Sequence, residues 1–155
     1  RPDLPRLVVV GGQGWGDVNL VQLAAQHGVA DRVELAGFLS DADLGALYAG
    51  AELLIYPSLY EGFGFPVLEA MSMGCPVVTS CSSSLPEVGG AAALYADPAD
   101  PAALARAVAR ILDDAALAAR LRADGLRRAR MFTWQRCARE TVAVYRRTLA
   151  RCGGR

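Results

Sequence analysis

The sequence predicts a three-layer α/β domain in which helices cover both faces of a mostly parallel sheet. Short apolar runs alternate along the chain with longer segments of helical period, as expected of a parallel sheet with helical crossovers. The apolar runs are continuous and rich in β-branched residues, which is typical of strands buried on both faces. With 155 residues, of which 53% are hydrophobic, the chain is long enough for one core, so residues 1–155 are expected to form a single domain.

Five short apolar runs are the expected strands, because each is bounded by glycine, proline or polar residues. They are residues 7–10, 33–36, 53–56, 76–79 and 92–95. The first run, Leu-Val-Val-Val, is expected to be buried on both faces. The segments that follow the strands should gather at one edge of the sheet, where ligands of parallel sheets bind. These segments are Gly11-Gly12, Gly37-Phe38, the loop after residue 56 and the serine-rich loop 80–84.

Seven helical segments are expected between and after these strands. The first is capped by Asp17 and ends at His27, with Gly28 as the helix-terminating residue. The second, residues 41–49, is capped by Ser40 or Asp41. The expected ranges of the others are 66–73, 85–88, 102–112, 115–131 and 134–151.

The loop between the third strand and the third helix, residues 57–64, carries the clearest chemical signal, and we call it the glutamate loop. Pro66 suits the first helical turn, where its missing N–H group costs nothing. Glu61 lies in the loop, and Glu69 lies in or just after the first helical turn. Between them the backbone N–H groups of residues 62–65 are free for a ligand, and amides at a helix N-terminus favour anions and polar oxygens. Two carboxylates beside a row of donors suit a ligand with both phosphates and hydroxyls, such as a nucleotide sugar.

The same residues carry a family resemblance. Glu61 and Glu69 are the ends of an E-x7-E pattern, within Glu-Gly-Phe-Gly-Phe-Pro-Val-Leu-Glu-Ala-Met. This motif resembles that of retaining glycosyltransferases with the GT-B architecture, and matching segments lie on both sides, at 8–12, 31–38, 74–78 and 85–88. The chain resembles the C-terminal, donor-binding half of a family-4, mannosyltransferase-like enzyme over nearly its whole length. The resemblance implies a Rossmann-like domain.

The resemblance also implies roles for individual residues. Glu69 would accept both hydroxyls of the donor ribose, and Glu61 would meet the hydroxyls of the donor sugar and help to stabilise positive charge on the anomeric carbon. Glu61 is therefore the candidate catalytic residue, although the motif does not show it reaching that carbon as a nucleophile. The predicted donor-binding residues are Gly12, Gly37, Phe38, Leu39, Glu61, Gly62, Phe63, Gly64, Phe65 and Glu69.

By the same resemblance, the enzyme moves a hexose from a nucleotide diphosphate to a glycan or lipid-linked acceptor without a metal or other cofactor. Segments 14–16 and 82–88 favour the mannosyltransferases of bacterial surface-polysaccharide synthesis, with GDP-mannose as donor. UDP-glucose or another UDP-sugar stays open, because recognition of the base by backbone leaves little trace in side chains. The domain is expected to be truncated at its N-terminal edge, before a strand–helix unit that supplies a phosphate-binding Arg and Lys. Helix 133–151 is expected to pack toward an absent N-terminal domain that binds the acceptor, and the fragment alone is expected to be inactive.

Other sites have weaker support in the sequence. Residues 11–16 contain four glycines but no G-x-G-x-x-G pattern, which argues against a dinucleotide site. Asp41-Ala42-Asp43 has the D-x-D pattern of some metal sites, but acidic residues are also favoured in a first helical turn. His27 is the only histidine and has no partner for triad chemistry. The four cysteines form no C-x-x-C pair, so we expect no metal site or disulfide framework and a reducing, cytoplasmic compartment.

Charge is balanced but unevenly distributed. All 16 basic residues are arginine, and most of them follow Arg106. They are either solvated helix faces or a surface for anionic lipid at the inner face of the membrane. Nucleic acid is not expected, because no aromatic side chains interleave with the arginines. Two alternative functions remain, a non-catalytic interaction module that uses these helices and a GT-B-shaped epimerase. A phosphorylase would need a lysine for its pyridoxal cofactor, and the chain contains none.

Overall fold

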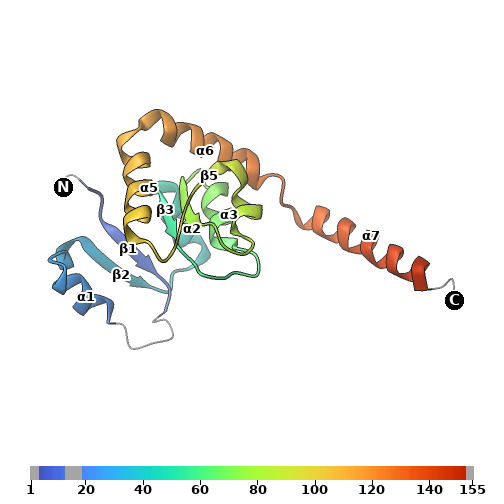
Figure 1. The fold of residues 1–155 in the computed structure, drawn as a ribbon, viewed down its shortest axis with the longest axis horizontal. Helices are drawn as coiled ribbons and strands as arrows, with labels where there is room; N and C mark the ends of the chain where they lie inside the picture. The colour runs from blue at the N-terminus through green and yellow to red at the C-terminus, as the bar shows by residue number, and fades with distance from the viewer. Residues whose placement is uncertain (1–3, 13–18, 153–155) are drawn as a thin grey trace.

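The computed structural model describes residues 4–12 and 19–152 (Figure 1). The predicted helix cap Asp17 and the segment 14–16 lie outside these residues. The first described helix, α1 (Leu20–Gln26), begins after Asn19, whose side chain accepts a hydrogen bond from the Gln22 N–H at 3.1 Å. It ends as predicted, with His27 as its C-cap and Gly28 in the left-handed conformation.

The five predicted strands form, and all their pairings are parallel. The strands are β1 (Leu7–Val10), β2 (Val33–Gly37), β3 (Leu54–Tyr56), β4 (Val77–Ser80) and β5 (Ala93–Ala96). They make two sheets, one with the order β1-β2 and one with the order β3-β4-β5. The prediction of an α/β domain with parallel strands is therefore confirmed, but the described strands do not form one continuous sheet.

The burial of β1 differs from the prediction. Leu7 and Val10, at its two ends, are 47% and 36% exposed, and the strands β1 and β2 contribute no residue to the two hydrophobic clusters of the described chain. Burial on both faces needs helices above and below the strand, as well as neighbours at both edges. Among the described residues β1 pairs only with β2, and Figure 1 shows this pair set apart from the three-stranded sheet. The apolar run therefore predicted the strand correctly but its burial wrongly.

Helices cover both faces of the three-stranded sheet, which gives the predicted three layers (Figure 1). On one face Val77 packs with Val67 and Met71, and on the other Val78 packs with Ile111 and Leu121. Adjacent residues of β4 thus point to opposite faces, as the pleat of a strand requires. The first face is covered by α2 (Asp41–Gly50), α3 (Phe65–Ser72) and α4 (Leu85–Gly89), and the second by α5 (Pro101–Asp113) and α6 (Ala115–Ala129). Two short 3-10 helices, η1 (Ala30–Arg32) and η2 (Gly90–Ala92), precede β2 and β5.

The D-x-D segment lies where a cap was predicted. Ser40 caps α2, because its hydroxyl oxygen accepts a hydrogen bond from the Asp43 N–H at 3.2 Å. The same hydroxyl donates to the Asp43 carboxylate at 2.6 Å, so Asp43 is engaged within the cap. Asp41 also lies in the first turn of α2, where the helix dipole favours an acidic side chain.

Two arginines of α6 have a structural role that the sequence did not predict. Arg122 donates to the carbonyl oxygen of Gly74 at 3.0 Å, just after α3. Arg128 donates through Nε to the carbonyl oxygen of Val88 at 2.9 Å, and its guanidinium carbon lies 5.0 Å from the centre of the Phe132 ring. These side chains tie α6 to the segment after α3 and to α4, so part of the basic segment is neither a solvated face nor a free anion-binding surface.

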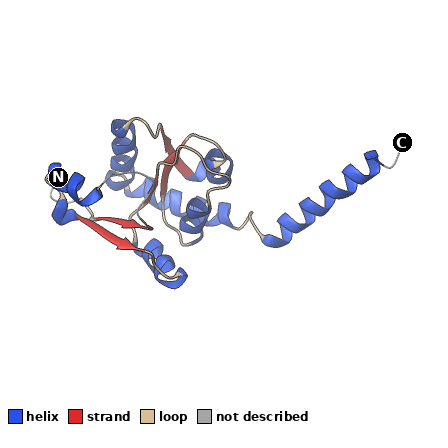
Figure 2. Cartoon of the chain, turned by 90° about the horizontal axis from the view of Figure 1, so that it is seen from below, coloured by secondary structure: helices blue, strands red, loops and turns tan. Residues whose placement is uncertain are grey.

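The last helix, α7 (Trp134–Cys152), extends away from the body of the domain (Figures 1 and 2). Every residue from Trp134 to Arg151 is exposed. The large apolar side chains Trp134, Tyr145 and Leu149 are 76%, 64% and 71% exposed. None of the described helices combines the length and apolar character needed to cross a bilayer.

Tyr48 makes the stability of the fold sensitive to alkaline pH. Its side chain is buried, and burial, followed by the negative charges of Glu69 and the Cys75 thiolate, raises the pKa of its phenol to about 12. Because this value is above the ordinary value of 10, the stabilising contribution is complete below pH ~10 and is lost as pH rises toward 12. We expect Tyr48→Phe to flatten the decline in unfolding free energy between about pH 9 and about pH 12, as measured by urea denaturation. Tyr145→Phe, at an exposed position, should leave the decline unchanged, and an equal decline in Tyr48→Phe and the wild type would contradict this assignment.

Candidate functional site

The glutamate loop lies between β3 and α3, as predicted. Gly64 is the N-cap residue of α3, and its carbonyl oxygen accepts the first helical hydrogen bond from the Val67 N–H at 3.1 Å. Pro66 lies in the first turn, where it needs no hydrogen-bond acceptor. Glu69 follows in the next turn of α3, so the helix carries one carboxylate and the loop carries the other.

Gly64 fixes the direction in which the loop enters the helix. Its backbone is left-handed, with φ +102°, a conformation that residues other than glycine rarely adopt. A Cβ atom at this position would lie 2.7 Å from Cδ2 of Leu85, which is fully buried. The loop and α4 therefore touch at a point that only glycine can occupy without displacement.

The two glutamates lie within electrostatic reach of one tyrosine. The Tyr56 hydroxyl, at the end of β3, donates a hydrogen bond to Oε1 of Glu61 at 2.5 Å. Burial first, and then this hydrogen bond, raise the pKa of Tyr56 well above its ordinary range, and the charges of both Glu61 and Glu69 add to the effect. Tyr56 was not among the predicted site residues, since only the fold brings its hydroxyl to the loop.

The Glu69 carboxylate is available to a ligand. Glu69 is exposed, and its carboxylate makes no hydrogen bond or ion pair with any described residue. The N–H groups of residues 62–65 likewise have no acceptor in the described part of the chain. The loop thus presents a row of donors between two carboxylates.

The aromatic residues of the loop have different surroundings. The Phe63 ring is half-buried, with its centre 4.7 Å from that of Phe65 and 5.9 Å from that of Phe132. Phe65 is 51% exposed. Phe63 therefore anchors the loop to the domain, whereas Phe65 leaves an apolar surface beside the free amides.

The remaining predicted donor-binding residues gather at the carboxyl ends of β1 and β2. The Gly11 N–H donates to the carbonyl oxygen of Gly37 at 2.8 Å. The Phe38 ring is 87% exposed, and its edge lies 2.9 Å from the position that a Cβ atom of Gly12 would occupy. Gly12, Gly37, Phe38 and Leu39 thus form one group, and the glutamate loop follows a strand of the other sheet. Both groups lie beyond carboxyl strand ends, where ligands of parallel sheets bind.

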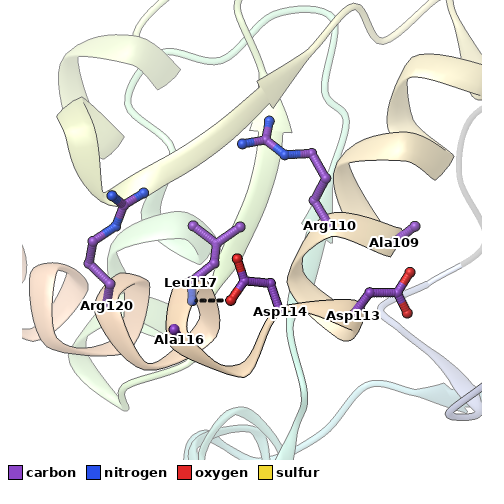
Figure 3. Close-up of a pocket in the computed structure, with 7 residues that line it drawn as sticks. All are labelled: Ala109, Arg110, Asp113, Asp114, Ala116, Leu117 and Arg120. Atoms are coloured by element: carbon purple, nitrogen blue, oxygen red, sulfur yellow. Dashed lines mark hydrogen bonds between the residues drawn. The ribbon is translucent and has the colours of Figure 1, made fainter.

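A hollow elsewhere on the domain does not include any predicted site residue. It lies at the junction of α5 and α6 (Figure 3) and is lined by Ala109, Arg110, Asp113, Asp114, Ala116, Leu117 and Arg120. Asp114 caps α6 there by accepting a hydrogen bond from the Leu117 N–H at 2.9 Å. Two arginines and two aspartates balance in charge, and we assign no ligand to it. Within the described ranges, no group of three or more His, Cys, Asp or Glu side chains is placed to hold a metal ion.

Comparison with known proteins identifies the family of the chain. The family model described as "Glycosyl transferases group 1" matches residues 3–128. The O-antigen chain mannosyltransferase B of Escherichia coli is 42% identical over 140 residues, which make up 90% of this chain and 37% of that protein. The MMP alpha-(1->4)-mannosyltransferase of Mycolicibacterium hassiacum is 44% identical over 134 residues, or 84% of this chain and 33% of that protein.

A solved structure shows the same fold. Sucrose-phosphate synthase from Thermosynechococcus elongatus matches with a TM-score of 0.81 at 31% identity, over 94% of this chain and 39% of that one. The chain therefore spans 33% to 37% of the length of the two mannosyltransferases and a similar share of the solved chain. Since the family model covers most of the sequence, including the glutamate loop, the predicted resemblance is confirmed and the chain belongs to the glycosyl transferases group 1 family.

Proposed function

We propose that this domain binds the nucleotide-sugar donor of a retaining enzyme that transfers a hexose to a glycan or lipid-linked acceptor. The observation that carries the proposal is the arrangement at the carboxyl end of β3. The Tyr56 hydroxyl donates to Glu61, and Glu69 lies in the helix that follows the loop. The amides of residues 62–65, which have no acceptor among the described residues, lie between the two glutamates in the chain. This arrangement offers acceptors for sugar hydroxyls and donors for phosphate or hydroxyl oxygens of the same ligand.

Each group has a part in the proposed complex. Glu69 accepts hydrogen bonds from the two ribose hydroxyls, and the amides of residues 62–65 donate to the diphosphate or to the hexose. Glu61 accepts from the hexose hydroxyls and stabilises positive charge that develops on the anomeric carbon, since a preorganised charge stabilises a transition state of opposite sign. Gly12 and the backbone of residues 37–39 contact the nucleobase. No metal ion takes part in this scheme.

Mannose is the favoured hexose, with GDP-mannose as the donor. The names of the two curated relatives support this choice, since both are mannosyltransferases and share 42% and 44% of the aligned residues with this chain. A UDP-sugar is the alternative donor. GDP-mannose and a UDP-sugar differ in the nucleobase, which the backbone of residues 37–39 would contact. Because backbone contacts leave little trace in the choice of side chains, direct titration distinguishes the two donors better than the sequence of the site does.

The acceptor and the basic residues that neutralise the diphosphate are proposed to belong to parts of the enzyme outside this chain. The described residues place no arginine in the glutamate loop, and the chain has no lysine. We also propose that α7 packs on the acceptor-binding half, because its exposed apolar residues Trp134, Tyr145 and Leu149 lack partners in the described domain. Burying such side chains against a protein surface stabilises the assembly in proportion to the apolar area removed from water.

Calorimetric titration of the full-length protein with GDP and with UDP tests the proposal. We expect GDP to bind more tightly than UDP, and Glu69→Ala to weaken the binding of the preferred nucleotide. A second candidate, an interaction module, is favoured by the exposed arginines and apolar residues of α7. Tight binding to vesicles of anionic phospholipid, together with no binding to either nucleotide, would support the module and contradict the donor-binding function.

A further inference from the structure

We propose that Ser83 and Ser84 are positioning residues that hold Glu61, and that they thereby set how strongly the site prefers a nucleotide sugar over the bare nucleotide. The inference rests on the proposed function and extends it from the glutamate loop to the serine-rich loop after β4. Neither serine has to touch the donor. Both act through Glu61, which would meet the hexose.

The two serines hold both backbone groups of Glu61. The Glu61 N–H donates to Oγ of Ser83 at 2.9 Å. The Ser84 hydroxyl lies 3.1 Å from the carbonyl oxygen of Glu61 and 2.8 Å from that of Phe63, and it shares its single hydrogen between them. With the Tyr56 hydroxyl on its carboxylate, Glu61 is restrained at its N–H, its C=O and its side chain.

The backbone of Ser83 is strained in a way that serves this contact. Its φ is +52°, and it is the one residue other than glycine with a positive φ in the part of the chain that the structure describes. The left-handed conformation is unfavourable for a residue with a Cβ atom. Such strain persists where surrounding structure requires it and is frequent at functional sites. Ser83 is exposed, so burial of its side chain does not compensate the cost, whereas its hydrogen bond to Glu61 does so in part.

Ser83 and Ser84 continue a regular set of contacts between β4 and the glutamate loop. Four hydroxyl side chains at positions 79, 80, 83 and 84 bind backbone groups at positions 56, 58, 61 and 63. Thr79 and Ser80 are fully buried and hold the base of the loop, at 2.8 Å and 2.5 Å from their acceptors. The last two serines hold its far end, where Glu61 lies. The first pair therefore stabilises the fold, and the second pair sets the position of a site residue.

Restraining Glu61 before the donor binds should increase the affinity that the ligand gains from its hexose. A loop that becomes ordered only on binding loses conformational entropy at that moment, and the affinity falls accordingly. Since Glu61 is proposed to contact the hexose and not the nucleotide, this loss should appear with GDP-mannose and be small with GDP. The ratio of the two affinities therefore reports on the serines separately from the rest of the site.

Ser83→Gly is the sharpest test, because glycine adopts φ +52° without strain but cannot accept the hydrogen bond from Glu61. In the full-length protein we expect the melting temperature not to fall, the Kd of GDP to stay unchanged, and the Kd of GDP-mannose to rise about 5- to 10-fold, the value of one hydrogen bond. Ser84→Ala should also raise the Kd of GDP-mannose. Ser84→Thr, which keeps the hydroxyl, should have a Kd close to that of the wild type. Ser82→Ala is the matched control, since the Ser82 hydroxyl has no hydrogen bond with a described residue.

The outcomes separate this inference from the proposed function. Equal loss of GDP and GDP-mannose binding in Ser83→Gly, or no change in either, would overturn the positioning role. The proposed function would still be supported if the wild-type protein bound GDP-mannose. A wild-type protein that binds neither GDP-mannose nor a UDP-sugar would overturn the proposed function itself. A selective loss of GDP-mannose affinity at an unchanged melting temperature supports the inference, because a merely structural role would lower stability and both affinities together.

Discussion

Replacing Glu69 with alanine is expected to weaken the binding of GDP and of GDP-mannose by the same factor, about 10- to 100-fold. Both ligands carry the ribose that Glu69 is proposed to hold. Hydrogen bonds to a charged group contribute roughly 1.5–3 kcal/mol, and about 1.4 kcal/mol corresponds to a tenfold change in Kd. Calorimetric titration of the full-length protein measures both constants. The equal effect on the two ligands distinguishes Glu69 from Ser83, whose substitution should affect only the sugar nucleotide.

Stability should be nearly unaffected by the same substitution. Glu69 is exposed, and its carboxylate makes no hydrogen bond or ion pair with a described residue. Surface substitutions of this kind usually change the unfolding free energy by less than about 0.5 kcal/mol. Glu140→Ala is a suitable control, since Glu140 is also exposed and, among the described residues, pairs only with Arg136 on α7, at 2.7 Å. If Glu69→Ala bound GDP as tightly as the wild type, the assignment of the ribose to Glu69 would be wrong.

Gly64→Ala should have the largest effect on the fold, a loss of about 2–4 kcal/mol in unfolding free energy. Adopting φ +102° strains any residue with a Cβ atom. The added atom would also meet Cδ2 of Leu85 at 2.7 Å, and overpacking of a core side chain costs about 1–3 kcal/mol. Leu85 is fully buried between α3 and α4, so it has little room to move. Urea denaturation measures the change.

Gly62→Ala is the matched control for this prediction. Gly62 belongs to the same loop, but a Cβ atom there would meet no other atom within 4 Å and its φ is not in the left-handed range. Its unfolding free energy should therefore stay close to that of the wild type. Equal stabilities of Gly64→Ala and Gly62→Ala would show that the contact between the loop and α4 does not fix the loop.

The elements near the glutamate loop could be predicted because their signals are local. Pro57 and Pro66 mark the end of β3 and the start of α3, and the spacing of Glu61 and Glu69 places one acid in the loop and one in the helix. The caps were less fully predicted: Ser40 was one of two predicted caps of α2, and Asn19, which caps α1, was not among the predictions. The predicted cap Asp17 lies outside the described residues. Several polar residues in succession each have the chemistry of a cap, and their order alone does not decide between them.

The other features of the site depend on contacts between segments far apart in the chain, and the periodicity of the sequence does not predict such contacts. Tyr56 reads as the last residue of an apolar strand, and only the fold brings its hydroxyl to Glu61. Ser83 lies in a run of serines with no turn signal that would predict its left-handed backbone. The burial predicted for β1 was wrong for a related reason, since the pattern of a strand does not report whether neighbours cover it. The sequence therefore predicted which residues of the glutamate loop carry the chemistry. It did not predict the residues outside the loop, such as Tyr56 and Ser83, that form hydrogen bonds with Glu61.

The measurement that tests the central claim most directly is a crystal structure of the full-length protein with GDP-mannose bound. It should place the ribose hydroxyls within hydrogen-bond distance of the Glu69 carboxylate and the mannose hydroxyls beside Glu61, with the amides of residues 62–65 directed at the ligand. A donor bound elsewhere, with Glu61 and Glu69 left in contact with solvent only, would contradict it.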